Sequence, residues 1–173
     1  KIGAYMLNLK VNTSGSDFTE GWHEVVIASA DAGDWNGTKY IDLRFNDFPE
    51  SLKCRIWSAK NKETGEDFGL GNLYYYAVAG ITTADDDGNL SIDDKPTNLV
   101  GKRLNVLFYK KENGYTEIVD RVAPVITTDG PVIFTDSHVA SLKTKAETRR
   151  DSKVGTPVNG VATTESSDGL PVF

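Results

Sequence analysis

Lysine, arginine and aromatic residues recur at alternate positions in three short segments of the chain. They are Lys53, Arg55 and Trp57 in one segment, Tyr40 and Arg44 in a second, and Arg103, Tyr109 and Lys111 in a third. Alternate side chains of an extended strand point to the same face, so each segment would present a face that is both basic and aromatic. Cations track phosphate groups and flat rings stack on bases, which is the chemistry of surfaces that bind single-stranded nucleic acid.

Turns next to these segments carry more residues of the same kinds. Trp35 lies in Asp34-Trp35-Asn36-Gly37, a turn in which a large ring is difficult to bury. We therefore expect the base-stacking residues to be Trp35, Tyr40, Trp57, Tyr109 and Tyr115. We expect the phosphate-contacting residues to be Arg44, Lys53, Arg55, Lys60, Lys62, Arg103, Lys110 and Lys111. The alternative is that the rings are ordinary strand residues covered by a helix or by the tail.

Five strand-like runs and one helical run would position these residues. Runs rich in aliphatic and aromatic residues, bounded by turn residues, predict strands over 24–31, 39–45, 52–57, 103–111 and 115–122. Apolar residues at helical spacing predict a helix over 69–79, with Asn72 as its N-cap and Gly80 as its stop. The order β-β-β-α-β-β is that of an OB-fold, so we expect a mainly β, five-stranded OB-fold-like barrel. A generic α+β sheet is the alternative.

The alternation also assigns the interior of the barrel. The apolar set on the other face of each strand would fill it: Ile41, Leu43, Phe45, Leu52, Cys54, Ile56, Leu104, Val106 and Phe108.

The charge balance limits the class of partner. The 173 residues include 19 Lys or Arg and 25 Asp or Glu, a formal net charge of −6. This balance disfavours a protein that coats duplex DNA or a membrane surface. However, acids gather at Asp85-Asp86-Asp87 and Asp93-Asp94, in the loop before the fourth predicted strand. A narrow basic groove therefore remains compatible with the acidic total.

The composition changes near Pro124. Apart from the final Phe173, the only aromatic residue beyond Tyr115 is Phe134. So little apolar surface favours disorder, because burial cannot offset the entropy lost on ordering. We expect an N-terminal lead-in over 1–19, an OB-like binding domain over 20–124, and a largely disordered C-terminal tail over 125–173. Neither a membrane-spanning run nor a signal-peptide pattern is evident, which favours the cytoplasm.

Patterns for catalysis or metal binding are weak. Asp85 to Asn89 resembles part of a calcium loop, but Thr83 and Asp94 occupy positions that normally hold Asp and Glu. Two histidines are too few for a zinc enzyme, and Cys54 has no evident catalytic partner. We therefore expect a non-enzymatic protein without a metal or another cofactor.

The C-terminal end resembles a known docking segment. Glu165-Ser166-Ser167-Asp168-Gly169-Leu170-Pro171-Val172-Phe173 ends in acids, Leu-Pro and a terminal Phe. It is similar to the C-terminal tip of bacterial single-stranded-DNA-binding proteins, which docks into replication and repair proteins. The resemblance implies partner docking through Asp168, Leu170, Pro171 and Phe173, by carboxylate capture and aromatic anchoring. The chain differs in having two acids rather than a dense run, and in placing Val172 before Phe173.

The body of the chain carries a second resemblance. The segments EGWHEVVI (20–27), GTKYIDLRF (37–45), GKRLNV (101–106) and NGY (113–115) resemble small phage-encoded proteins of recombination and replication modules. Those proteins are regarded as single-stranded-DNA-binding proteins with OB-like folds. The resemblance covers about residues 17–124 and implies sequence-independent binding of single-stranded DNA in the host cytoplasm. In that family Phe18 and Trp22 would anchor the chain to the barrel.

A function of another class stays open at this point. The acidic total also fits an OB-like viral protein-interaction or structural module without affinity for nucleic acid. In that case Trp35 and Trp57 would lie in a protein interface, for example within a homodimer.

Overall fold

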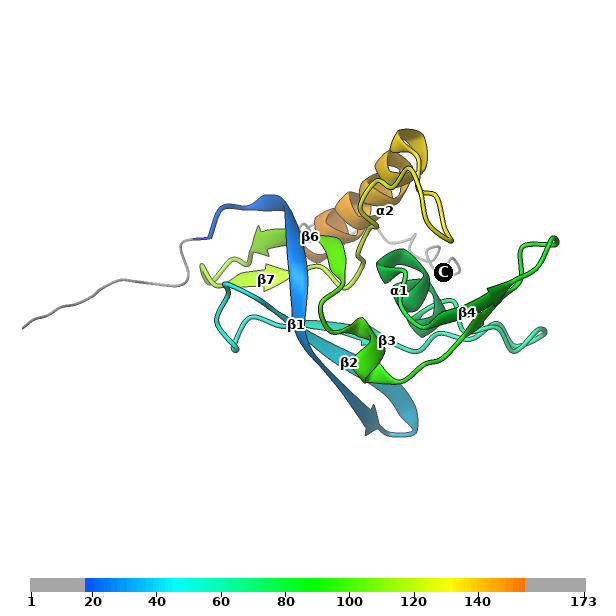
Figure 1. Ribbon diagram of the computed structural model, residues 1–173. Coiled ribbons are helices and arrows are strands. Elements are labelled where there is room, and N and C mark those ends of the chain that lie inside the picture. The colour runs from blue at the N-terminus through cyan, green and yellow to red at the C-terminus, as the bar shows by residue number, and fades with distance from the viewer. Residues whose placement is uncertain (1–17, 155–173) are drawn as a thin grey trace, which may run out of the picture.

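The strand β1 (Gly21–Trp35) organises the molecule because it is long enough to pair with two neighbours. In the computed structural model, which describes residues 18–154, its first part pairs antiparallel with β6 (Arg103–Lys110) and its second part with β2 (Thr38–Phe45). The register with β2 shifts just beyond Ile27. An irregularity of this kind bends a strand, and Figure 1 shows β1 passing between its two sets of partners.

The sheet closes almost completely into a barrel. Its order is β3-β2-β1-β6-β7, with β3 (Cys54–Trp57) and β7 (Thr116–Ile118) at the two ends. These ends face each other across a seam, where the Cys54 thiol lies 3.5 Å from the Val119 carbonyl oxygen as a hydrogen-bond donor. The predicted mainly β, five-stranded OB-like barrel is thus confirmed.

The barrel interior is filled by the side chains that strand alternation assigned to it. All nine are buried: Ile41, Leu43, Phe45, Leu52, Cys54, Ile56, Leu104, Val106 and Phe108. The strand boundaries differ more than the faces do. β1 exceeds the predicted 24–31 at both ends, whereas β7 is shorter than the predicted 115–122.

The helix α1 (Leu70–Ala77) follows β3, as predicted, but begins and ends differently. The Asp67 carboxylate, and not Asn72, accepts the first free N–H groups, those of Gly69 and Leu70, at 3.0 and 2.9 Å. The helix ends at Ala77, because the next residue, Val78, has a φ of 52° in the left-handed region, two residues before Gly80.

A second, two-stranded sheet was absent from the prediction. It pairs β4 (Ile81–Ala84) with β5 (Leu90–Ile92) and is followed by the short 3-10 helix η2 (Pro96–Leu99). The acidic segment from Asp85 to Asn89 is the turn of this hairpin. The Asp85 Oδ1 atom accepts the N–H groups of Asp87 and Asn89, both at 2.9 Å. Its carboxylate therefore serves to shape the turn.

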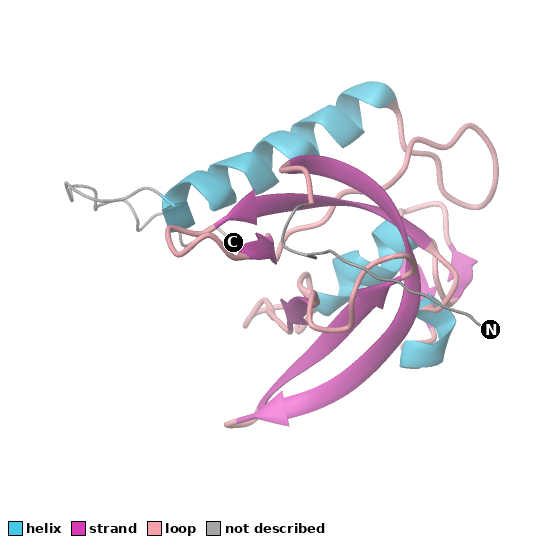
Figure 2. Cartoon of the chain, turned by 90° about the vertical axis from the view of Figure 1, so that its left-hand side faces the viewer, coloured by secondary structure: helices cyan, strands magenta, loops and turns pink. Residues whose placement is uncertain are grey.

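The folded part of the chain extends beyond residue 124, where the tail was predicted to start. Residues 125–154 pack on the barrel instead of forming a disordered segment, and α2 (Asp136–Val154) lies along one side of it (Figure 2). Phe134 and Val139 are buried against α1 and the residues that follow it, and Ala146 is buried against the outer face of β6. The predicted domain boundary at 124 therefore falls inside the folded unit. The part of the predicted tail from 155 to 173 lies outside the described residues.

Phe134 should contribute strongly to stability. Its ring is fully buried and contacts Tyr75 and Tyr76, with centroids 5.0 and 6.1 Å away. Replacing a buried Phe by Ala leaves a cavity and typically costs about 3–5 kcal/mol. We expect Phe134→Ala to lower the free energy of unfolding by this amount in urea denaturation. The neighbouring Ile133→Ala is the control, because that side chain is 49% exposed. Equal small effects of both variants would contradict the packing of this segment.

Candidate nucleic-acid interface

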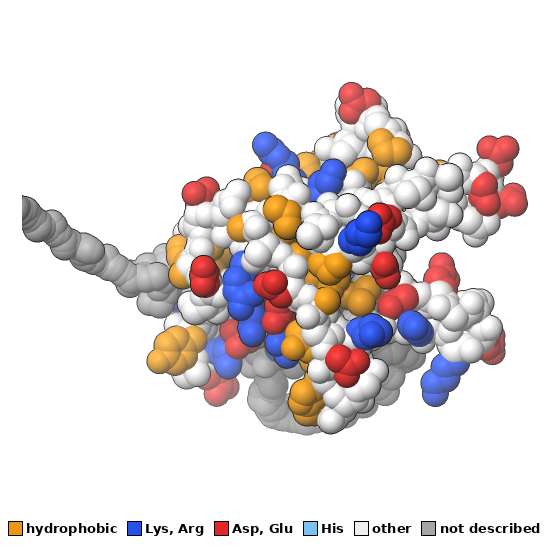
Figure 3. All heavy atoms as spheres, turned by 60° about the horizontal axis from the view of Figure 1, so that its bottom comes forward, with side chains coloured by type: hydrophobic (Ala, Val, Ile, Leu, Met, Phe, Trp, Pro, Cys, Tyr) orange, Lys and Arg blue, Asp and Glu red, His pale blue; other side chains and the backbone are white. Residues whose placement is uncertain are grey.

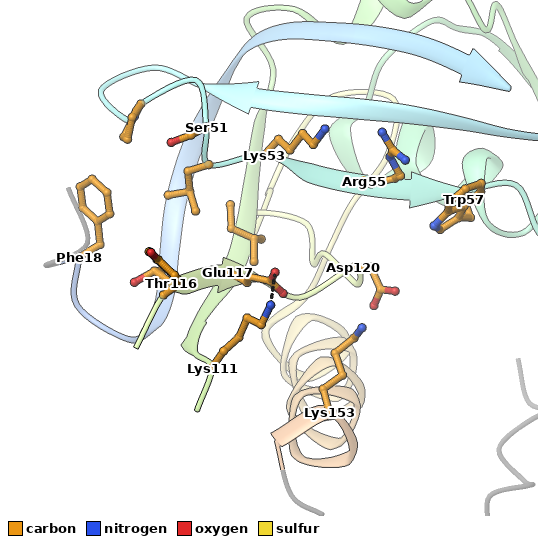
Figure 4. Close-up of a pocket in the computed structure, with 14 residues that line it drawn as sticks. Phe18, Ser51, Lys53, Arg55, Trp57, Lys111, Thr116, Glu117, Asp120 and Lys153 are labelled. Atoms are coloured by element: carbon orange, nitrogen blue, oxygen red, sulfur yellow. Dashed lines mark hydrogen bonds and ion pairs between the residues drawn. The ribbon is translucent and has the colours of Figure 1, made fainter. Parts of the chain in front are cut away.

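A groove runs along the seam between β3 and β7, with a volume of about 920 Å³. We call it the β3–β7 groove. Figure 4 shows Arg55 and Trp57 along β3 and Lys53 just before it, with Lys111 and Glu117 across the seam and Lys153 extending from α2. Its lining residues are Phe18, Pro49, Ser51, Leu52, Lys53, Arg55, Trp57, Lys111, Tyr115, Thr116, Glu117, Ile118, Asp120 and Lys153. The groove exists because the barrel is not fully closed.

Five of the residues predicted from the sequence to bind nucleic acid line this groove. They are Lys53, Arg55, Trp57, Lys111 and Tyr115. Arg55 and Trp57 come from β3, Lys53 directly precedes it, and the other two come from the turn between β6 and β7. The seam thus brings together segments that are more than 50 residues apart. Tyr115 is 67% exposed, which leaves its ring free to take a ligand.

Three aromatic rings continue from the groove onto the β1–β2 ribbon. Trp57 lies with its ring centroid 5.1 Å from that of Tyr40 and 6.5 Å from that of Trp35, both in edge-on geometry. Trp35, at the tip of the ribbon, is 63% exposed. Tyr40 pairs with Gly33 across the ladder, and a Cβ atom on Gly33 would come within 2.3 Å of the tyrosine ring. Because Gly33 has no side chain, the Tyr40 ring can lie over it on this face of the sheet.

Arg55 contacts both the aromatic row and the β3–β7 groove. Its guanidinium carbon lies 3.8 Å from the centre of the Tyr40 ring and 5.6 Å from that of Trp57. It also donates two hydrogen bonds to the buried carboxylate of Asp42, from Nε at 2.7 Å and from Nη2 at 2.8 Å. Lys53 Nζ lies 3.5 Å from the same carboxylate. The hydrogen bonds from Arg55 hold the pKa of Asp42 below its ordinary value, against the effect of burial.

Asp42 thus pairs with both Arg55 of β3 and Lys53 just before it, and neutralises only part of their charge. Two of the guanidinium nitrogens bind Asp42, and the Nη1 group, with its two further donors, is left over. Sequence reasoning placed Asp42 on the outer face but assigned it no part in the interface.

α2 supplies a groove cation that sequence reasoning missed. Lys153 lies in the last turn of α2, within the segment expected to be disordered, and no carboxylate of residues 18–154 forms an ion pair with it. On the opposite wall Lys111 pairs with Glu117 at 3.2 Å. The lining therefore holds four cations and two carboxylates, and one of the latter, Asp120, accepts two hydrogen bonds from Arg149 at 3.0 Å.

Tyr109 does not belong to this surface. Its side chain is 6% exposed because α2 covers the outer face of β6, where Tyr109 packs with Leu107, Val119 and Ala146. Its hydroxyl donates to Glu117 at 2.9 Å, and burial, together with this carboxylate, raises the pKa of the phenol to about 12. The assignment of Tyr109 to base stacking is therefore wrong for the folded chain, and the alternative of cover by the tail holds for this residue.

Several predicted phosphate contacts lie outside the groove lining. Arg103 pairs with Glu24 at 2.6 Å, and Arg44 pairs with Asp31 at 3.2 Å. Exposed cations outside the lining are Lys60 and Lys62, in the segment after β3, and Lys110, at the end of β6.

Trp22 and Phe18 both pack on the barrel, as the resemblance noted for residues 17–124 implied. The Trp22 indole donates to Glu147 of α2 at 2.8 Å, and the Phe18 ring lies 6.2 Å from that of Phe108. Phe18 also reaches the end of the β3–β7 groove. The predicted docking residues Asp168, Leu170, Pro171 and Phe173 lie outside the described residues.

The described residues also bear on metal-ligand groups, on the one cysteine and on membrane-spanning helices. Between residues 18 and 154, no three His, Cys, Asp or Glu side chains are grouped so that they could hold a metal ion. Cys54 is buried, and burial raises the pKa of its thiol well above the ordinary range, so it is not a reactive thiolate. None of the helices in this part of the chain has the length and apolar character needed to cross a membrane.

Comparison of the chain with protein-family models and with curated proteins gives no match.

Asp42→Asn should change how stability depends on pH. A lowered folded-state pKa means that the ionised carboxylate stabilises the fold above the pKa of the unfolded chain, and that this contribution is lost as the pH falls through the folded-state pKa. We expect the variant to be less stable than wild type at pH 7 and to lose less further stability between about pH 5 and pH 2.

Urea denaturation across this pH range measures the effect. Asp31→Asn is the control, because it removes an exposed ion pair with Arg44, and such pairs contribute little. Parallel acid profiles of wild type and Asp42→Asn would show that the pairing with Arg55 does not stabilise the fold.

Proposed function

We propose that the protein binds single-stranded DNA, without sequence preference, along the β3–β7 groove and the aromatic row of Trp35, Tyr40 and Trp57. The observation that carries the proposal is the placement of exposed or half-buried rings and of cations along one continuous surface. Figure 3 displays the side on which β2 and β3 lie, where basic and hydrophobic side chains are interspersed with acids.

The position of this surface on the barrel supports the proposal. OB-folds bind oligonucleotides on the face of their second and third strands and on the loops that join strands 1–2 and 4–5. The corresponding parts here are β2, β3, the β1–β2 turn next to Trp35, and the β6–β7 turn between Lys111 and Tyr115. Fold analogy alone does not indicate a ligand, but here the side chains at these positions have the required chemistry.

The kinds of contact fit a single strand better than a duplex. Trp35 is 63% exposed and could stack on a base, whereas a duplex keeps its bases stacked within itself. The Tyr40 ring lies under the Arg55 guanidinium, so it would support this surface more than offer a free face. Lys53, Lys111 and the Nη1 group of Arg55 would contact phosphates along the groove. Stacking supplies affinity that does not depend on net charge, so the formal charge of −6 is compatible with binding.

Trp57→Ala should weaken binding of an oligo-dT strand. Trp57 lies where the groove meets the aromatic row, and loss of one stacking platform costs about 1–3 kcal/mol, or about 5- to 150-fold in Kd. Fluorescence anisotropy of labelled oligo-dT at low salt gives the Kd. Trp22→Phe is the control, because Trp22 packs beneath α2 and removing its indole should leave the Kd unchanged. A wild-type protein that does not bind oligo-dT would overturn the proposal, and equal Kd values for wild type and Trp57→Ala would exclude this surface.

Lys111→Gln should reduce the salt dependence of binding. For a single strand, log K falls with log salt by about 0.7 per phosphate neutralised, so loss of one phosphate contact should make the slope shallower by about 0.7. Arg103→Gln makes the same change of charge at a residue that pairs with Glu24 outside the groove lining. Its slope should match that of wild type, and an equal change in both variants would show that overall charge, rather than the groove, governs binding.

A further inference from the structure

A second hollow continues the β3–β7 groove beyond Trp57. It has a volume of about 450 Å³ and lies between α1, α2 and the end of β3. Two residues, Trp57 and Asp120, line both hollows, so the two are adjacent on the surface. We call the second one the α1–α2 hollow.

The walls of the α1–α2 hollow are basic. Arg121, Lys145 and Arg149 line it, and the one carboxylate among its lining residues is Asp120. Asp120 accepts hydrogen bonds from Arg149 Nε and Nη2, both at 3.0 Å. Burial alone would raise the pKa of Asp120, but these bonds and the nearby cations lower it, so the group is an ionised and paired carboxylate.

This pairing leaves Arg121 and Lys145 as the excess charge of the hollow. Both side chains are exposed, and no carboxylate within the described chain, residues 18–154, forms an ion pair with either.

The cations of α2 follow the path from one hollow to the other. Lys145, Arg149 and Lys153 are spaced by four residues, so they lie on one face of the helix. Lys153 lines the β3–β7 groove, whereas Lys145 and Arg149 line the α1–α2 hollow. The helix therefore presents a row of positive charge along both.

The floor of the α1–α2 hollow is partly aromatic. Phe68 and Tyr76 line it together with the amide side chain of Asn72. It thus repeats the combination of flat rings and cations found in the groove.

We propose that bound single-stranded DNA continues past Trp57 into the α1–α2 hollow, where Arg121 and Lys145 contact its phosphates. This inference rests on the proposed function and extends it, because it makes the helix that covers the barrel a second wall of the binding path. A polyanion is favoured over a small anion, because the excess charges are distributed along two adjoining hollows.

The test compares a short and a long strand. Oligo-dT of about 6 nucleotides can occupy the groove alone, whereas one of about 15 nucleotides can follow both hollows. The variant Arg121→Gln/Lys145→Gln should bind the long strand several-fold more weakly than wild type does, with a salt slope shallower by about 1.4, and should bind the short strand as wild type does. Lys95→Gln/Lys102→Gln is the matched control, because it removes the same charge from residues that line neither hollow.

The outcomes separate the two proposals. Circular dichroism first establishes that each variant is folded. A long strand that binds the Arg121→Gln/Lys145→Gln variant as tightly as it binds wild type would overturn the extension and leave the groove intact. The extension would also be overturned if the Arg121→Gln/Lys145→Gln variant bound the short and the long strand more weakly by the same factor. It would likewise be overturned if the Lys95→Gln/Lys102→Gln control weakened binding of the long strand as much as that variant does. Failure of wild type to bind either strand would overturn both proposals.

Discussion

The shared strand β1 is the constraint on which the rest of the structure depends. Its first part is committed to β6 and its second part to β2, so both halves of the barrel are positioned relative to one strand. The sheet therefore curls until its two ends, β3 and β7, approach each other without a ladder between them. The β3–β7 groove lies at this incomplete closure, which places Lys53 of the segment before β3 and Lys111 after β6 on the lining of one groove. The candidate interface is in this sense a consequence of the barrel's connectivity.

Alternation along single strands could be predicted from the sequence because it depends only on local backbone geometry. It assigned the interior correctly in β2, β3 and β6, and it placed Arg55 and Trp57 on the outer face. The same rule could not distinguish an outer residue that faces solvent from one that another element covers. Tyr109 and Arg55 both have the outward parity, but α2 lies over the first and leaves the second in the groove.

The packed part of the C-terminal segment was missed for a related physical reason. α2 contributes mainly one valine and one alanine to the core, Val139 and Ala146, so its own sequence has no apolar stripe. Most of the apolar surface in that contact belongs to the barrel, in Leu107 and Val119, and to Phe134 before the helix. A helix of this kind is stabilised by tertiary packing rather than by its own pattern. One signal in the sequence is the four-residue spacing of Lys145, Arg149 and Lys153, which indicates a helix with a single basic face.

The contact between Gly33 and Tyr40 has a consequence for how this surface can vary. Any side chain at position 33 would occupy the space of the tyrosine ring and displace it from Arg55 and Trp57. The two positions are therefore coupled, although they lie on different strands and only one of them carries a functional group. In related chains, a ring at position 40 would have to be inherited together with glycine at position 33. A larger residue at position 33 would indicate that the ring at position 40 is absent or packs elsewhere.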